Sequence, residues 1–167
     1  MAATAQRFNP VALRLGFGII LIVHGLGRFN IGPFASEAGV GGFAQFLGGP
    51  LGVPVPLFFA WMVTIVEVLG GLLILVGLFT RYAAALAAID MFVAMTLFHL
   101  PRGFSAYANA GYEYTMMLTL VGIALVLSGP GALSLEVAIF DRELLPAPIG
   151  AALGVEVAEE MGGPGSD

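Results

Sequence analysis

The fold of this chain is decided by the stretch LFFAWMVTIVEVLGGLLILVGLF, residues 57–79, in which Glu67 is the one ionisable residue. A helix needs about 20 mostly apolar residues, at 1.5 Å each, to cross the hydrocarbon core of a bilayer. Residues 57–79 meet that length. Three further apolar stretches come close to it, residues 11–29, 82–100 and 112–129, the last only just. The sequence therefore predicts an integral membrane protein.

Composition and spacing support one helical bundle. The chain has 167 residues, of which 59% are hydrophobic, and a mean hydropathy of +0.97. Four spans leave no room for a separate soluble domain. Because the connection between residues 79 and 82 is short, the second and third spans form a hairpin. We expect an all-α fold, an integral membrane four-helix bundle with antiparallel neighbouring helices, over residues 1–140.

Residue counts exclude several kinds of chemistry. The chain contains no cysteine, which rules out disulfide relays, thiolate nucleophiles and iron–sulfur clusters within it. It also contains no lysine, and its two histidines are too few for a protein-only zinc or copper site unless carboxylates complete it. The net charge of −5 arises mainly in the C-terminal tail. We therefore expect no metal site and no nucleic-acid partner.

The distribution of arginines predicts the orientation. Four spans place both termini on one side, and that side carries more of the basic residues, which favours cytoplasmic termini. We expect a multi-pass protein with both termini in the cytoplasm and the lipid bilayer as its surroundings. On this orientation the inner side carries four arginines and the outer side two: Arg7, Arg14, Arg81 and Arg142 inside, and Arg28 and Arg102 outside.

Two segments outside the spans are distinctive. The connection 30–56 holds seven glycines and four prolines, together with Phe43, Phe46 and Leu47. It is either a lid over a cavity or a poorly ordered apolar loop. After the fourth span, Ser134 is placed to cap a short helix that ends near Phe140. Residues 141–167 are acidic and predict a disordered cytoplasmic tail, with one short helix around 151–161.

Two carboxylates are expected at the same depth in adjacent spans. Glu67 and Asp90 each lie ten residues from the outer end of their stretch, or roughly 15 Å deep. Both share a helix face with small residues, which mark helix contacts in membranes. They should therefore point into the bundle, and two close carboxylates require a proton or a cation. We expect Arg14 to supply that cation.

A second polar cluster is expected nearer the outer face. It contains His24, Arg28, His99, Arg102 and Glu113, and we expect either Arg28 or Arg102 to pair with Glu113. Simpler interpretations stay open, because buried ionisable groups also fix helix order, and His24 can be an ordinary packed histidine. A haem held by His24 and His99 is conceivable, but the nine-residue spacing places His99 off the Asp90 face.

Several motifs along the chain resemble one known family. The motifs are LRLG at 13–16, HGLGRF at 24–29, EVLGGLL at 67–73, GLFTR at 77–81, DM at 90–91, His99 with GF at 103–104, GYEY at 111–114 and GPGALSL at 129–135. In this order they resemble the DoxX family of small membrane proteins over about residues 12–136, apart from the glycine-rich loop. A position that is often lysine in the family is Arg28 here.

The resemblance implies a four-helix inner-membrane protein. Some DoxX members are membrane subunits of oxidoreductases that pass electrons to quinone, so we expect a quinone-linked oxidoreductase subunit with no covalently bound cofactor. Either a redox partner protein or a substrate that reacts directly with quinone would supply the electrons, since no electron carrier is visible in the sequence. Expected proton-handling residues are His24, Glu67, Asp90 and Glu113, and expected quinone contacts are Arg14, His24, Arg28, His99 and Glu113. The alternative is a non-enzymatic scaffold, assembly factor or small-solute carrier with a structural polar core.

Overall fold

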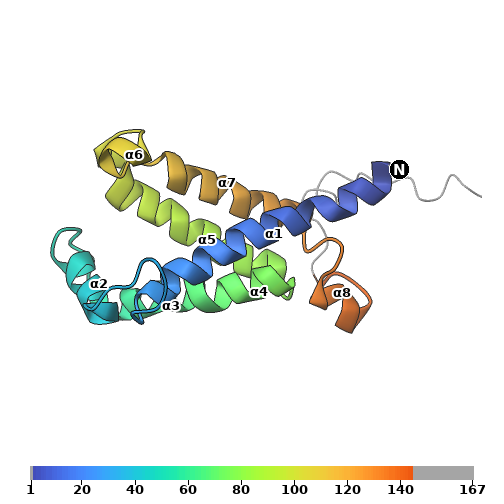
Figure 1. Ribbon diagram of the computed structural model, residues 1–167, viewed down its shortest axis with the longest axis horizontal. Coiled ribbons are helices and arrows are strands. Elements are labelled where there is room, and N and C mark those ends of the chain that lie inside the picture. Colours follow the sequence, from blue (N-terminus) through green and yellow to red (C-terminus); the bar gives the residue numbers. More distant parts are fainter. Residues whose placement is uncertain (1, 145–167) are drawn as a thin grey trace, which may run out of the picture.

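The computed structural model describes residues 2–144, with side chains from Phe8 onward, and the regular elements in this range are all helices (Figure 1). The predicted disorder of the tail beyond residue 144, and its predicted helix at 151–161, lie outside the described residues.

Four stretches of helix make up most of the molecule. The first is α1, Ala2–Gly27. The second joins α3, Pro56–Ile65, through the π-helical turn η1, Val66–Gly70, to α4, Gly71–Val76. The third joins α5, Thr80–Ala94, to the π-helical turn η2, Met95–His99, and the 3₁₀ turn η3, Leu100–Arg102. The fourth is α7, Glu113–Ser128.

Three of these stretches are long and apolar enough to cross a membrane: Phe8–Gly27, Pro56–Val76 and Thr80–Arg102. The fourth, α7, has 16 residues and is therefore about 24 Å long. That is shorter than a hydrocarbon core of about 30 Å, so α7 spans a membrane only with a mismatch that local thinning of the bilayer or its flanking residues take up. The structure thus supports a membrane protein, with three helices of full spanning length.

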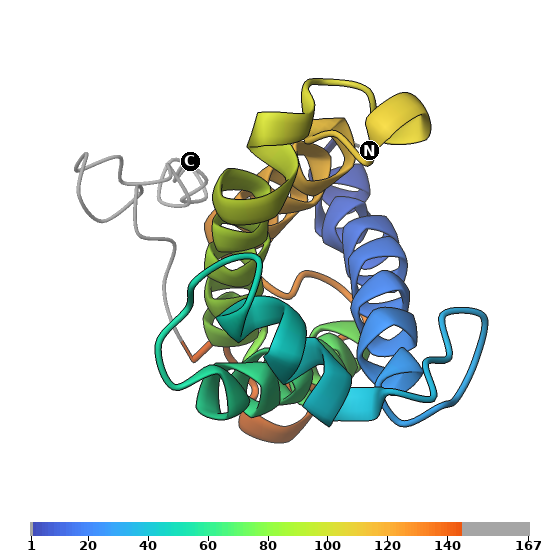
Figure 2. The same cartoon turned by 90° about the vertical axis from the view of Figure 1, so that its left-hand side faces the viewer.

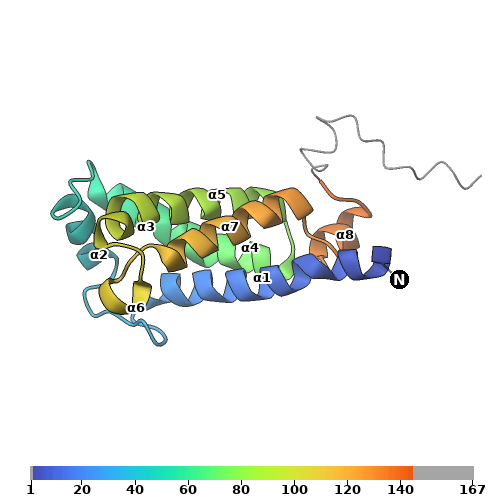
Figure 3. The ribbon, with the colours of Figure 1, turned by 90° about the horizontal axis from the view of Figure 1, so that it is seen from above.

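Short helices lie at the two ends of the long ones. Helix α2, Gly39–Gly48, and helix α6, Ala106–Asn109, lie at one end, and helix α8, Leu135–Phe140, lies at the other, the end at which α1 begins (Figures 1 and 3). A view along the long helices shows α2 lying across that end of the molecule (Figure 2). We call this the α2 end and the opposite one the α8 end.

Glycines bring the long helices close together. A Cβ on Gly18 of α1 would lie 2.8 Å from the carbonyl oxygen of Gly71, and one on Gly25 would lie 3.1 Å from the Cβ of Glu67. On α7, a Cβ on Gly122 would lie 2.8 Å from that of Ala88. Small residues allow close backbone approach in membranes, where water supplies no hydrophobic drive between helices. The predicted small-residue contacts around Glu67 are therefore confirmed.

Arg14 lies at the α8 end and does not reach the carboxylates. Its guanidinium donates to five backbone carbonyls, at distances of 2.7–3.2 Å. The prediction that Arg14 is the cation shared by Glu67 and Asp90 is wrong, because the ends of two chain segments already saturate its donors. These acceptors are Ile74 and Leu75 at the end of α4 and Pro130, Ala132 and Leu133 after α7.

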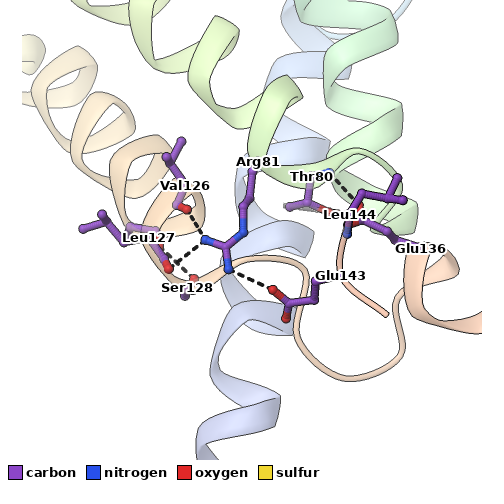
Figure 4. A network of polar contacts seen from close by, with 9 residues as sticks. Thr80, Arg81, Val126, Leu127, Ser128, Glu136, Glu143 and Leu144 are labelled. Carbon is purple, nitrogen blue, oxygen red and sulfur yellow. Dashed lines mark hydrogen bonds and ion pairs between the residues drawn. The ribbon is translucent and has the colours of Figure 1, made fainter. Parts of the chain in front are cut away.

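A second network fixes the segment around α8 (Figure 4). Arg81 donates to the carbonyls of Val126 and Leu127 and pairs with Glu143 at 2.8 Å. The buried Glu136 accepts from the backbone N–H of Thr80 at 3.3 Å and of Leu144 at 2.7 Å. Residues 143 and 144 are thus held against the helices.

The expected cap of α8 is present. The Ser134 hydroxyl accepts from the N–H of Val137 at 3.3 Å, which satisfies one donor at the start of this helix.

Candidate functional site

A cavity of about 340 Å³ lies inside the molecule toward the α2 end. Its wall is mostly apolar and aromatic, and α2 contributes side chains to it. The predicted lid is thus a helix that lines a cavity, and not a loop without structure. The lining residues are Ile20, Leu21, His24, Arg28, Phe43, Phe46, Leu47, Leu51, Val63, Glu67, Asp90, Met91, Val93, Ala94, Leu97, Phe98, His99, Tyr114, Thr115 and Leu118.

Glu67 pairs with Arg28 on the cavity wall. Each nitrogen of the guanidinium fork faces one carboxylate oxygen, with Nη2 and Oε1 3.1 Å apart and Nη1 paired to Oε2. Both side chains are largely buried, at 16% and 6% exposed. The expected pairing of Arg28 with Glu113 is therefore wrong. Arg28 reaches Glu67 because Gly25, one turn earlier in α1, lets this helix approach the second stretch closely.

Asp90 lines the same cavity as Glu67, as the shared depth and the small-residue faces predicted. Its Oδ2 atom is buried and has no hydrogen-bond partner among residues 2–144. An unsatisfied buried oxygen costs about 1–3 kcal/mol. Among the lining residues, Asp90 is therefore the one that carries an unsatisfied buried side-chain oxygen in the described part of the chain.

Both histidines reach the cavity wall, and their rings are held in the same way. The Nδ1 atom of His24 lies 2.8 Å from the carbonyl oxygen of Ile20, and that of His99 lies 2.6 Å from the carbonyl oxygen of Ala110. A carbonyl only accepts, so each Nδ1 carries the proton. No hydrogen bond to the Nε2 atom of either ring occurs within residues 2–144.

The other members of the predicted outer cluster lie elsewhere. Glu113 accepts from the backbone N–H of Ala106 at 2.7 Å, which fixes the loop before α7, and its side chain is not part of the cavity wall. Arg102 lies 3.5 Å above the ring of Phe98 and donates to the carbonyl of that residue. The predicted pairing of either arginine with Glu113 is therefore absent from the described residues.

Aromatic side chains supply contacts that sequence reasoning missed. The Arg28 guanidinium lies 4.1 Å above the ring of Phe43, which ties α2 to the ion pair. The ring of Phe34 stacks on that of His24 with centroids 4.4 Å apart. Tyr114 also lines the cavity, next to the Glu113 that was expected there. Helical spacing is the signal that could have found Tyr114, since Leu118, four positions later in α7, lines the same cavity.

This arrangement is suited to a mostly apolar molecule that carries a few polar groups. Ligand sites in proteins are commonly apolar pockets of about 300–1,000 Å³ with a few placed polar groups. Here the polar groups are an ion pair, one unsatisfied carboxyl and two imidazoles. Among residues 2–144, no three His, Asp or Glu side chains gather as a metal site would require.

The sequence profile of the DoxX family matches residues 10–100, more than half of the chain, including His24, Arg28, Glu67, Asp90 and His99. This chain belongs to the DoxX family. The family resemblance seen in the sequence motifs is thereby confirmed.

Three relatives align with this chain over most of their own length. A Bacillus subtilis protein named "Putative oxidoreductase CatD" is 34% identical over 79% of this chain and 87% of its own. An uncharacterised membrane protein of Mycobacterium tuberculosis is 33% identical, over 77% of this chain and 79% of its own. An uncharacterised protein of Haemophilus influenzae is 29% identical, over 82% of this chain and 97% of its own. No solved structure matches.

Proposed function

We propose that this DoxX-family protein is the membrane subunit of an oxidoreductase and that its cavity binds the ring of a quinone. The observation that carries the proposal is the cavity itself, where aromatic side chains surround an unsatisfied Asp90 and two imidazoles. The name of the Bacillus subtilis relative points to the same class of reaction.

Quinone chemistry needs groups that exchange protons at the ring oxygens. Reduction of a quinone takes up two electrons and two protons, so a site requires titratable groups beside the carbonyls. His24, His99 and Asp90 are of the right kind, and Arg28 with Glu67 holds a fixed charge pair next to them. The electrons come from a redox partner protein, which would dock from outside the membrane.

The composition is compatible with an electrophilic ligand. Quinones add to thiolates and primary amines, and the chain has no cysteine and no lysine. A quinone held in the cavity therefore meets no such side chain.

The membrane arrangement belongs to the same proposal. In it, α1, α3–α4, α5–η2 and α7 form a four-helix bundle with antiparallel neighbours in the bacterial inner membrane. The α8 end faces the cytoplasm, and the cavity lies in the outer half of the bilayer. The charge distribution supports this, since Arg14, Arg81 and Arg142 belong to the α8 end.

Filling the cavity tests the proposal. Ala94 lines the cavity on α5, and Ala94→Phe would place a ring inside it. We expect this variant, reconstituted in nanodiscs, to bind a short-chain benzoquinone at least tenfold more weakly in equilibrium dialysis. Quinone reduction in membranes that contain the partner should fall in parallel.

The matched control lies on the same helix. Ile89 is 61% exposed on the outside of α5 and does not line the cavity, so Ile89→Phe should leave binding unchanged. A folded Ala94→Phe protein that binds quinone as tightly as the parent would refute the quinone site.

One observation favours the second candidate, a non-enzymatic scaffold or small-solute carrier. The Arg28–Glu67 pair satisfies both its members and joins the end of α1 to η1, as purely structural polar groups do. On that alternative Ala94→Phe leaves every redox rate unchanged and alters only stability or solute uptake.

A further inference from the structure

Helix α8 turns its polar residues inward and its apolar residues outward. The side chains of Ser134, its cap, and of Glu136 are buried. The residues around them are apolar and exposed: Leu133, Leu135, Val137, Ala138, Ile139 and Phe140. A helix at a water-exposed surface shows the opposite pattern, with its apolar side against the protein. An exposed apolar surface of this kind marks contact with an apolar partner.

We propose that this partner is the lipid bilayer, and that the exposed side of α8 lies against the acyl chains of the leaflet at the α8 end. Helix α8 has six residues and is about 9 Å long, so it is too short to cross a bilayer. A short helix with an apolar side lies instead in the plane of the membrane, at the boundary between headgroups and acyl chains. The inference goes beyond the proposed function and involves neither the cavity nor its ligand.

The bonds of Arg14 place the start of α8 at the depth of a spanning helix. One atom of its guanidinium, Nη2, donates both to the carbonyl of Leu75 and to the carbonyl of Leu133, each at 3.2 Å. Leu75 lies inside the apolar stretch Pro56–Val76, which is long enough to cross a membrane. Leu133 is therefore at the level where that stretch ends, and a bilayer that covers the stretch reaches Leu133 as well.

Glu136 holds α8 at the same level. Its backbone N–H donates to the carbonyl of Gly77 at 2.9 Å, and its carboxylate accepts from the N–H of Thr80 at 3.3 Å. Gly77 directly follows the second long helical stretch, and Thr80 begins the third. These two stretches expose Phe79 and Tyr82 at this end. The apolar side of α8 thus continues the surface that the spanning helices present to lipid.

The charges of the chain mark where this surface ends. The side of α8 that is exposed carries no charged residue, so it offers nothing to a charged partner. Asp141 and Arg142 follow Phe140 directly, and both are exposed. Charged side chains are costly in hydrocarbon and are accommodated among headgroups and water. We therefore place the boundary of the acyl-chain layer at the end of α8.

The test measures what surrounds α8 in a bilayer. The chain has no cysteine, so a single introduced cysteine carries a nitroxide label without background. Leu133→Cys and Ile139→Cys place the label on the exposed side, where the parent residues are 78% and 56% exposed. Electron paramagnetic resonance of the full chain in liposomes then compares collisions with oxygen, which dissolves among acyl chains, and with a water-soluble nickel chelate.

Two control positions define lipid and water in the same protein. Leu86 on the spanning helix α5 is 56% exposed, as Ile139 is, so Leu86→Cys gives the collision ratio for lipid. Arg142→Cys gives the ratio for water. We expect the ratio of oxygen to nickel collisions at both α8 positions to be several-fold higher than at Arg142 and close to that at Leu86. Leu135→Cys replaces either α8 variant if circular dichroism shows that it does not fold.

The other occupants of this surface give different results. A ratio on α8 equal to that at Arg142 overturns the inference, because α8 then faces water. Low collision rates with both reagents overturn it as well, since a second copy of the chain or another segment of protein then covers α8. The measurement requires no ligand, so the quinone site can fail while this inference holds, and the reverse.

Discussion

At the scale of single residues, three buried or half-buried arginines hold segments of this protein together, and each does so through a different set of acceptors. Arg14 donates to five carbonyls, Arg28 to one carboxylate, and Arg81 to two carbonyls and the carboxylate of Glu143. A planar guanidinium with five fixed N–H groups can hold such sets of acceptors, whereas a lysine ammonium has three donors and no fork. The absence of lysine from the chain is consistent with this use of arginine.

The role of Arg14 gives a stability prediction. Arg14→Ala removes the donor from several buried carbonyls, so the free energy of unfolding should fall by about 3 kcal/mol. Arg14→Lys should recover less than half of that loss, because charge alone does not reproduce the fork. The measurement is equilibrium unfolding in detergent, followed by circular dichroism.

The control for this prediction is another arginine near the α8 end. Arg142 is exposed, and Arg142→Ala should change the free energy of unfolding by less than about 0.5 kcal/mol. Full rescue by Arg14→Lys would show that charge, and not hydrogen-bond geometry, is what the site requires.

At the scale of elements, two π-helical turns decide which side chains face the cavity. Glu67 lies in η1 and His99 lies in η2. A π-helical turn holds more residues than an α-helical turn, so it rotates the following side chains around the helix axis. His99, the last residue of η2, lies on the cavity wall, although α-helical spacing placed it off the Asp90 face.

The glycines of α1 give a prediction at this scale. A Cβ on Gly18 would lie 2.8 Å from the backbone oxygen of Gly71, so Gly18→Ala should force α1 and α4 apart and lower the thermal unfolding midpoint in detergent. Two positions earlier, Gly16 has no neighbour within 4 Å of such a Cβ. Gly16→Ala should therefore raise the midpoint, since alanine favours the helix by up to about 1 kcal/mol. Equal effects of the two changes would contradict the close contact.

At the scale of the whole molecule, the two ends have different constructions. The α8 end is closed by the hydrogen bonds of Arg14, Arg81 and Glu136, which hold residues 130–144 to the helices. The α2 end contains the cavity, whose wall is mostly aromatic and apolar. The cavity therefore lies at the end of the molecule away from this hydrogen-bond network.

Topology is the prediction at this scale. With four spans, reporters fused after Arg81 and after the C-terminal residue should both report the cytoplasm, and a reporter in the 103–112 connection should report the opposite side. Alkaline phosphatase and green fluorescent protein fusions measure this in whole cells. A C-terminal reporter on the outer side would mean that α7, which is short for a span, does not cross the membrane.

The sequence by itself determined the helical class, the family, and the convergence of Glu67 and Asp90 on one interior. Hydrophobic runs indicate helices that face lipid, and small-residue faces indicate contacts between helices. Both signals lie within short stretches of the chain, so the sequence is enough to read them. Helix α8 and its Ser134 cap were also predictable, because a cap depends on a few neighbouring residues.

The tertiary structure decided the partners of the charged groups. Which acceptor Arg14, Arg28 or Glu113 meets depends on contacts between residues 7 to 119 positions apart, and spacing along one helix contains no information on them. His99 ends a π-helical turn, and the residue pattern of the chain does not predict that turn. Long arginine side chains extend to whatever carbonyl or carboxylate the packed helices present, so their roles exist only after the helices have packed.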